Sequence, residues 1–191
     1  MITELKIIRH FIGNPKPQTI REIARQIKAD YRITYIAIHR LMEKKIIKVQ
    51  AVGKSTLCQL DEKYYGIEIY QAENERRAEI LRNSNFKQLY QEIISKVNTG
   101  FFVLLLFGSY AQGKQTKTSD IDLMFISNEN DFESRISNLL SVLPLKTHAF
   151  VFTEEEFIRM KDAKKPNVVQ EAIEHNIILF GIEAYYSMKN A

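Results

Sequence analysis

The sequence predicts an α+β protein with two domains, and three observations carry this prediction. The first third of the chain reads as three helices followed by a β-hairpin, whereas the second half alternates apolar strand-like runs with helical segments. The charge changes as well, because residues 1–60 hold 12 Lys and Arg against 4 Asp and Glu, a net +8, while residues 61–191 hold 15 against 19, a net −4. We therefore expect domains at residues 1–62 and 85–191, joined by a helical linker at 63–84.

Apolar spacing and turn signals predict the elements of the first domain. A helical stripe of Ile, Leu and Phe covers residues 2–11, and the segment GNPKP then ends it. Thr19 and Glu22 form a capping box that opens a second helix, and a third helix is expected over about residues 33–45. Residues that alternate in polarity on both sides of Gly53-Lys54 predict the hairpin.

This order of three helices and a hairpin resembles the winged helix-turn-helix domain of prokaryotic regulators. The resemblance implies that the third helix enters the major groove of DNA. Four residues of this helix are expected in the domain core: Thr34, Ala37, Ile38 and Leu41. The residues expected to contact DNA are Arg32, Tyr35, His39 and Arg40 on the helix and Lys54 at the hairpin tip. Clustered positive charge favours nucleic-acid binding, while a dimerisation or protein-docking module stays open as an alternative.

The second domain begins with a continuous apolar run, FFVLLLF at residues 101–107. Such a run is typical of a central strand that is covered on both faces. The elements expected after it are strand IDLMFIS, helix FESRISNLLSVL, strand THAFVF, a helix opened by a capping box at Thr153, helix NVVQEAIEHN and a closing strand IILFG.

Two carboxylates stand at the start of the second of these strands, where acidic residues are unusual. Side chains alternate along a strand, so Asp120 and Asp122 point to the same side, about 7 Å apart. Carboxylates at this spacing can converge on Mg²⁺, which keeps water and substrate phosphates as its other ligands. Gly108 and Ser109 end the preceding strand; the glycine lets a phosphate approach the backbone, and the serine offers a hydroxyl. The pattern predicts a phosphate and metal site.

Gly108-Ser109, ten further residues and then Asp120-Ile121-Asp122 resemble the signature of the nucleotidyltransferase superfamily of the DNA polymerase beta type. The resemblance is closest to the minimal prokaryotic members and covers about residues 85–185. It implies a mixed β-sheet flanked by helices. It also implies that Gly108 and Ser109 hold a nucleoside triphosphate, with ATP as the first candidate, and that Asp120 and Asp122 are the catalytic ligands of Mg²⁺.

Active members of this superfamily usually supply a third carboxylate from a later strand. The corresponding stretch here, LKTHAFVF at residues 145–152, contains no Asp or Glu. His148 is a candidate base or metal ligand in this stretch, or simply a packed or exposed strand residue. Two functions follow. The protein is an enzyme that moves a nucleoside monophosphate to a hydroxyl of a small molecule or partner protein, or it is a DNA-binding regulator whose degenerate nucleotidyltransferase domain only binds nucleotide or dimerises.

The remaining composition narrows the setting of the protein. Its single cysteine, Cys58, excludes an intramolecular disulfide framework and a cysteine-based zinc site. The longest apolar run is too short to cross a bilayer, so we expect no membrane partner and a cytoplasmic location. DNA and nucleotide are the expected partners, and a homodimer on a palindromic DNA site stays open.

Overall fold

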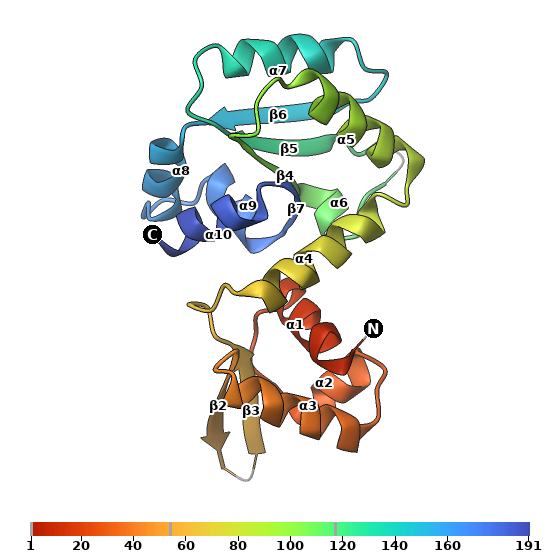
Figure 1. Cartoon of the computed structure of the whole chain (residues 1–191), viewed down its shortest axis with the longest axis vertical. Coiled ribbons are helices and arrows are strands. Elements are labelled where there is room, and N and C mark those ends of the chain that lie inside the picture. Colours follow the sequence, from red (N-terminus) through yellow and green to blue (C-terminus); the bar gives the residue numbers. More distant parts are fainter. Residues whose placement is uncertain (1, 54, 117) are drawn as a thin grey trace. The chain divides into compact units, whose positions relative to one another are not determined.

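The structure is a computed structural model that describes residues 2–53, 55–116 and 118–191. It divides into two compact units, the first ending at Glu75 and the second running from Arg76 to Ala191 (Figure 1). The boundary lies within α4 (Ile67–Ile80). Helices occur together with parallel and antiparallel strand pairs, which confirms the α+β class.

In its described residues, the first unit has three helices and a small antiparallel sheet before α4. Its elements before α4 are α1 (Thr3–Gly13), β1 (Gln18–Thr19), α2 (Ile20–Gln26), α3 (Tyr31–Glu43), β2 (Ile47–Val52) and β3 (Ser55–Leu60). The strand order is β1-β3-β2, so the predicted hairpin forms and gains a short third strand. The helices bury Ile7, Phe11, Ile23, Ile38 and Leu41 against one another.

The start of α3 differs from its prediction. The helix begins at Tyr31, two residues before the expected start, because the Asp30 side chain accepts hydrogen bonds from the backbone N–H groups of Arg32 and Ile33. The capping box of α2 is confirmed. The predicted inner face of α3 is also confirmed, since all four of its members are buried: Thr34, Ala37, Ile38 and Leu41.

The second unit is built around a four-stranded mixed sheet. Its elements after α4 are α5 (Ser84–Lys96), β4 (Val103–Phe107), α6 (Gly108–Ala111), β5 (Ile121–Ile126), α7 (Phe132–Ser141), β6 (Thr147–Phe152), α8 (Glu154–Lys161), α9 (Val168–Glu174), β7 (Asn176–Phe180) and α10 (Ile182–Asn190). The strand order is β6-β5-β4-β7, with β5 and β6 parallel and the other two pairs antiparallel.

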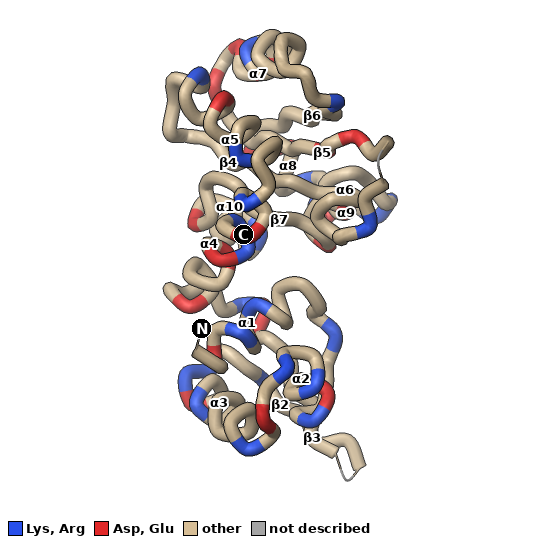
Figure 2. The backbone as a smooth tube through the Cα atoms, turned by 90° about the vertical axis from the view of Figure 1, so that its right-hand side faces the viewer, with Lys and Arg blue, Asp and Glu red and all other residues tan. Residues whose placement is uncertain are grey.

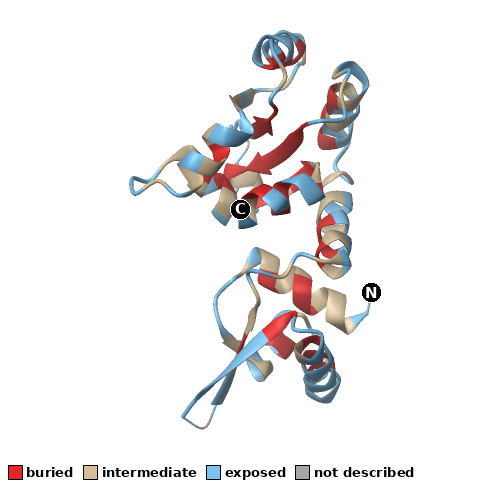
Figure 3. Cartoon of the chain, turned by 60° about the vertical axis from the view of Figure 1, so that its left-hand side comes forward, coloured by how far each residue is buried: buried red, intermediate tan, exposed pale blue. Residues whose placement is uncertain are grey.

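Helices cover both faces of this sheet. Leu104, Leu123 and Phe125 belong to a core with residues of α5 and α7. Alternate residues such as Leu105 and Met124 face the other side, where α8, α9 and α10 pack (Figure 1). All five residues of β4 are buried, as expected for a central strand, and Figure 3 shows the sheet as the most buried part of this unit.

α10 is absent from the sequence prediction. Gly181 reads as a stop after the closing strand, but it adopts φ +78° and leads into a further helix. A Cβ at this position would lie 2.6 Å from the carbonyl oxygen of Phe102, so the turn requires glycine. α10 buries Tyr185 and Met188.

In the described part of the chain, no helix is both long and apolar enough to cross a membrane.

Candidate active site

Gly108 and Asp122 meet at the end of the two central strands. Asp122 is the antiparallel register partner of Phe107, the last residue of β4. Gly108 then turns the chain with φ +67°, and a Cβ placed on it would lie 2.2 Å from Oδ2 of Asp122. The site therefore requires glycine for its backbone conformation and for the space that the carboxylate occupies. The structure brings these two predicted residues together.

Ser109 and Asp120 lie on either side of this contact. Ser109 is half-buried in α6, and its carbonyl oxygen accepts a 2.9 Å hydrogen bond from Lys114 N–H, which closes the turn. Asp120 is exposed and immediately precedes β5. The next residue, Ile121, is buried and donates its N–H to the carbonyl of Lys146 at 2.9 Å. This hydrogen bond holds the start of β5, where Asp120 and Asp122 flank the buried Ile121.

The electrostatics of Asp122 favour a bound cation. Burial raises the pKa of its carboxyl group above the ordinary value, the negative charge of Asp120 raises that pKa further, and His148 opposes both effects. A carboxylate in this position is short of positive charge. Binding of a cation or a proton at Asp122 would relieve the cost of keeping the group ionised.

His148 lies on β6, the later strand from which the sequence resemblance implies a third carboxylate. It is the parallel register partner of Asp122, and its Nδ1 lies 3.8 Å from Oδ1 of Asp122. Its side chain is 66% exposed, and its ring packs on Phe150 with centroids 4.6 Å apart. The signal that separates His148 from an ordinary strand residue is the strand register, which the sequence does not contain.

The carboxylates of the site match part of what a divalent metal needs. Within the described ranges, no group of three or more His, Cys, Asp and Glu side chains could hold a metal ion on its own. Mg²⁺ is commonly bound by one or two carboxylates and completes its shell with substrate phosphates and water. Asp120 and Asp122 fit this second arrangement, because both offer hard oxygen ligands and, among the described residues, neither is paired with a Lys or Arg side chain.

A comparison with protein families agrees with this geometry. The family model described as polymerase beta nucleotidyltransferase matches residues 87–184, just over half of the chain. The chain belongs to this family. The matched residues include the sheet, Gly108, Ser109 and both aspartates of the nucleotidyltransferase domain. Searches among curated proteins and among solved structures gave no match.

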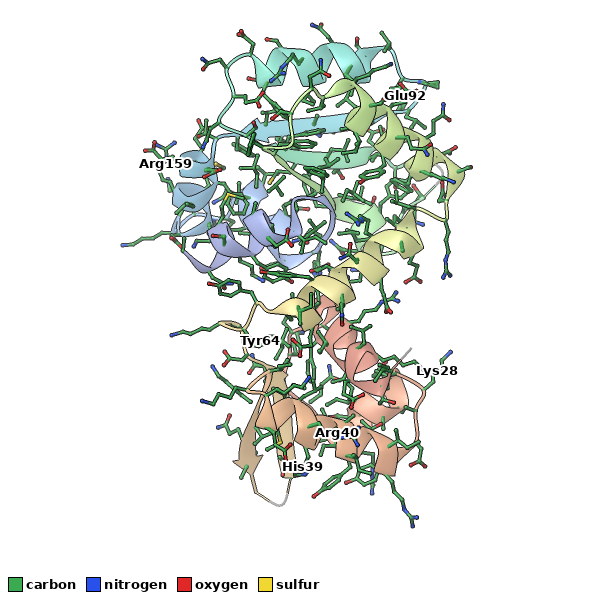
Figure 4. All side chains as sticks on the ribbon, viewed as in Figure 1. Lys28, His39, Arg40, Tyr64, Glu92 and Arg159 are labelled. Carbon is green, nitrogen blue, oxygen red and sulfur yellow. The ribbon has the colours of Figure 1, made fainter. Side chains whose placement is uncertain are left out.

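The residues expected to contact DNA lie together on α3. Arg32, Tyr35, His39 and Arg40 are all exposed, and Figure 4 labels the last two on this helix. The rings of Tyr35 and His39 are 4.3 Å apart, while Arg40 Nη1 pairs with Glu4 Oε1 at 3.1 Å. Lys54 lies outside the described residues.

The surroundings of these side chains add two features that sequence reasoning missed. α3 also exposes three large apolar side chains, Tyr31, Ile33 and Ile36. Lys and Arg are spread over the helices of the first unit (Figure 2), but its total charge is only +4, because residues 1–75 hold 13 Lys and Arg against 9 Asp and Glu. The positive excess is confined to the segment before α4.

Proposed function

We propose that the protein is a Mg²⁺-dependent nucleotidyltransferase that moves a nucleoside monophosphate from a nucleoside triphosphate to a hydroxyl acceptor. ATP is the first triphosphate to test. The observation that carries the proposal is the contact between Gly108 and Asp122. This contact brings the two halves of the family motif together at one end of the central strands β4 and β5. Family membership supports nucleotidyl transfer in general terms.

Each residue of the site has a defined task in this proposal. The bare backbone at Gly108 lets a phosphate oxygen come close, and the Ser109 hydroxyl donates to the triphosphate. Asp120 and Asp122 would hold the metal, which when bound neutralises charge on the phosphates and on the leaving pyrophosphate. His148 lies beside Asp122 on an exposed face, where it is the candidate to accept the proton of the attacking hydroxyl. Fixed placement of the reacting groups supplies the rest of the rate.

The first unit is proposed to bind DNA through α3 as a winged helix-turn-helix domain. Arg32 and Arg40 would contact phosphates or bases, and Tyr35 and His39 would lie against the same groove. The exposed Tyr31, Ile33 and Ile36 support a homodimer or a protein partner at this helix.

A second function is supported by β6. This strand carries His148 and no carboxylate beside Asp122, so the domain could bind nucleotide without transferring it. The protein would then be a DNA-binding regulator in which the nucleotidyltransferase domain senses a nucleotide or dimerises.

One experiment tests the first function and separates it from the second. ATP, GTP, CTP and UTP are titrated into the full chain with and without Mg²⁺, beside an Asp120→Ala/Asp122→Ala variant, and pyrophosphate release is followed in the presence of candidate hydroxyl acceptors. Metal-dependent binding that the variant loses, together with pyrophosphate release, supports the enzyme. Binding without release for any acceptor supports the regulator. Failure of all four nucleotides to bind contradicts the enzyme and the nucleotide sensor, and leaves a regulator whose nucleotidyltransferase domain only dimerises.

A further inference from the structure

A pocket lies beside the loop that joins α6 to β5, apart from the candidate active site. Its volume is about 420 Å³, within the range of small-molecule sites. Its lining comes from the start of α5, from α6, from the loop before β5 with the first residue of that strand, and from the loop before β6: Asn83, Asn85, Phe86, Tyr110, Thr118, Ser119, Ile121, Pro144, Leu145 and Lys146. None of the four proposed triphosphate and metal ligands is among these residues.

The pocket opens on the opposite side of β5 from the aspartates. Ile121 lines it and belongs to the core that α5 and α7 form. Asp122 follows in the strand and therefore points to the other side. A ligand in this pocket would not occupy the position of the triphosphate, although it would touch Ser119, which directly precedes Asp120.

The lining selects for a small organic anion. Lys146 is exposed and is in no ion pair among the described residues, and the lining contains no acidic side chain. Among the described lining residues Lys146 is the one Lys or Arg side chain, which favours a ligand with a single phosphate or carboxylate over a triphosphate. The pocket is therefore electrostatically suited to an anion with one charged group.

The other lining residues indicate what the uncharged part of the ligand is. Phe86 is buried, with 3% exposure, and its ring meets Tyr110 edge to face with centroids 5.1 Å apart, so the half-buried Tyr110 ring is the aromatic wall of the pocket. Asn85 and Thr118 are exposed and offer amide and hydroxyl groups at the mouth. The wall suits a flat ring, and the polar groups suit a sugar or the edge of a base.

We propose that this pocket is a second ligand site that binds a nucleoside monophosphate, with the phosphate at Lys146 and the base against Tyr110. We expect binding at this site without a metal ion, because no carboxylate is among the described residues that line it. It is also distinct from the triphosphate site on the far side of β5.

The test uses the full chain in EDTA, so that metal-dependent binding of triphosphate does not contribute. AMP, GMP, CMP and UMP are titrated by calorimetry, with inorganic phosphate and adenosine as separate probes for the two halves of the ligand. Two variants act on the pocket. Lys146→Ala removes its cation. Asn85→Glu places a carboxylate at its mouth, and this change should not hinder folding because an acid in the first turn of α5 suits the helix.

Lys87→Ala is the matched control. Lys87 is exposed on α5, two residues after Asn85, and does not line the pocket. We expect at least one nucleoside monophosphate to bind in EDTA. Lys146→Ala and Asn85→Glu should each weaken this binding at least about tenfold, and Lys87→Ala should leave it unchanged.

Three results would overturn the proposal. The first is that no nucleoside monophosphate binds in EDTA. The second is that binding occurs but Lys146→Ala and Asn85→Glu do not weaken it, because the ligand then lies elsewhere. The third is that inorganic phosphate binds as tightly as the whole nucleotide, because the aromatic wall then contributes nothing. Circular dichroism of each variant checks that the fold is intact.

Discussion

Gly108 and Gly113 have nearly the same backbone conformation, with φ of +67° and +66°, but different surroundings. A Cβ at Gly108 would collide with the carboxylate of Asp122, whereas a Cβ at Gly113 would meet nothing within 4 Å. A side chain at Gly113 would bear only the cost of the left-handed conformation, whereas a side chain at Gly108 would also collide with Asp122. This difference makes them a matched pair for mutation.

Gly108→Ala is expected to lower stability and to abolish metal-dependent nucleotide binding. Both alanine variants should pay about 1–2 kcal/mol for the left-handed conformation, but only Gly108→Ala must also displace Asp122. Thermal unfolding and nucleotide titration of both variants check this. Equal nucleotide affinity in the two variants would remove Gly108 from the site.

Asp122 is predicted to lower the stability of the metal-free protein at neutral pH. Its pKa in the fold is raised above 3.8, so its contribution to stability is fully present below the unfolded pKa and is lost as pH rises through the folded pKa. Asp122→Asn should therefore raise the melting temperature at pH 7 in EDTA, by an amount that shrinks toward pH 4. Mg²⁺ should stabilise the wild type and narrow the difference. A lower melting temperature for Asp122→Asn at pH 7 in EDTA would contradict this account.

Pairing of β5 with β6 decides what stands beside Asp122. His148→Asp would place a third carboxylate at the register partner of Asp122, and we expect it to raise the affinity for Mg²⁺ about tenfold, because affinity rises with the number of charged ligands. Thr147→Asp is the control, since it adds the same charge to β6 on the opposite face. Calorimetric titration of Mg²⁺ measures both variants. An equal gain in Mg²⁺ affinity for both variants would show that the added charge acts regardless of its position beside Asp122.

Local signals predicted most elements and part of the site. Capping boxes at Thr19 and Thr153 fixed two helix starts, and the apolar run before Gly108 predicted the central strand. The role of Asp30 as a helix cap was missed. α10 was missed as well, because its start depends on how Gly181 packs against Phe102. Strand neighbours are set by tertiary contacts, so the pairing of His148 with Asp122 could not be predicted from sequence.

The two units of the chain differ in charge, and this difference gives separate tests at the scale of the whole molecule. The first unit has a net charge of +4, whereas residues 76–191 hold 14 Lys and Arg against 14 Asp and Glu. Binding of DNA by the first unit should weaken steeply with salt, because phosphate contacts release counterions. Nucleotide binding in the second unit should instead be lost when Asp120 and Asp122 are replaced by alanine.

Arg32→Ala is expected to weaken DNA binding of the full chain and to reduce the slope of log affinity against log salt by about 1, the contribution of one phosphate contact. Arg32 is exposed on α3 and forms no ion pair within the described part of the chain. Fluorescence anisotropy with duplex DNA at several salt concentrations measures the slope, and Lys87→Ala in the second unit is the control. Arg40→Ala should have a smaller effect, because Arg40 gives up its pairing with Glu4 when it turns to DNA.

The same titration decides whether the two units communicate. If the nucleotide site controls DNA binding, a nucleoside triphosphate with Mg²⁺ must change the DNA affinity of the wild type, and DNA must change nucleotide affinity by the same factor. The Asp120→Ala/Asp122→Ala variant should then bind DNA at one affinity whether or not nucleotide is present. A salt slope that Arg32→Ala leaves unchanged would argue against α3 as the DNA-binding element, and the exposed Tyr31, Ile33 and Ile36 would then favour a protein partner on this helix.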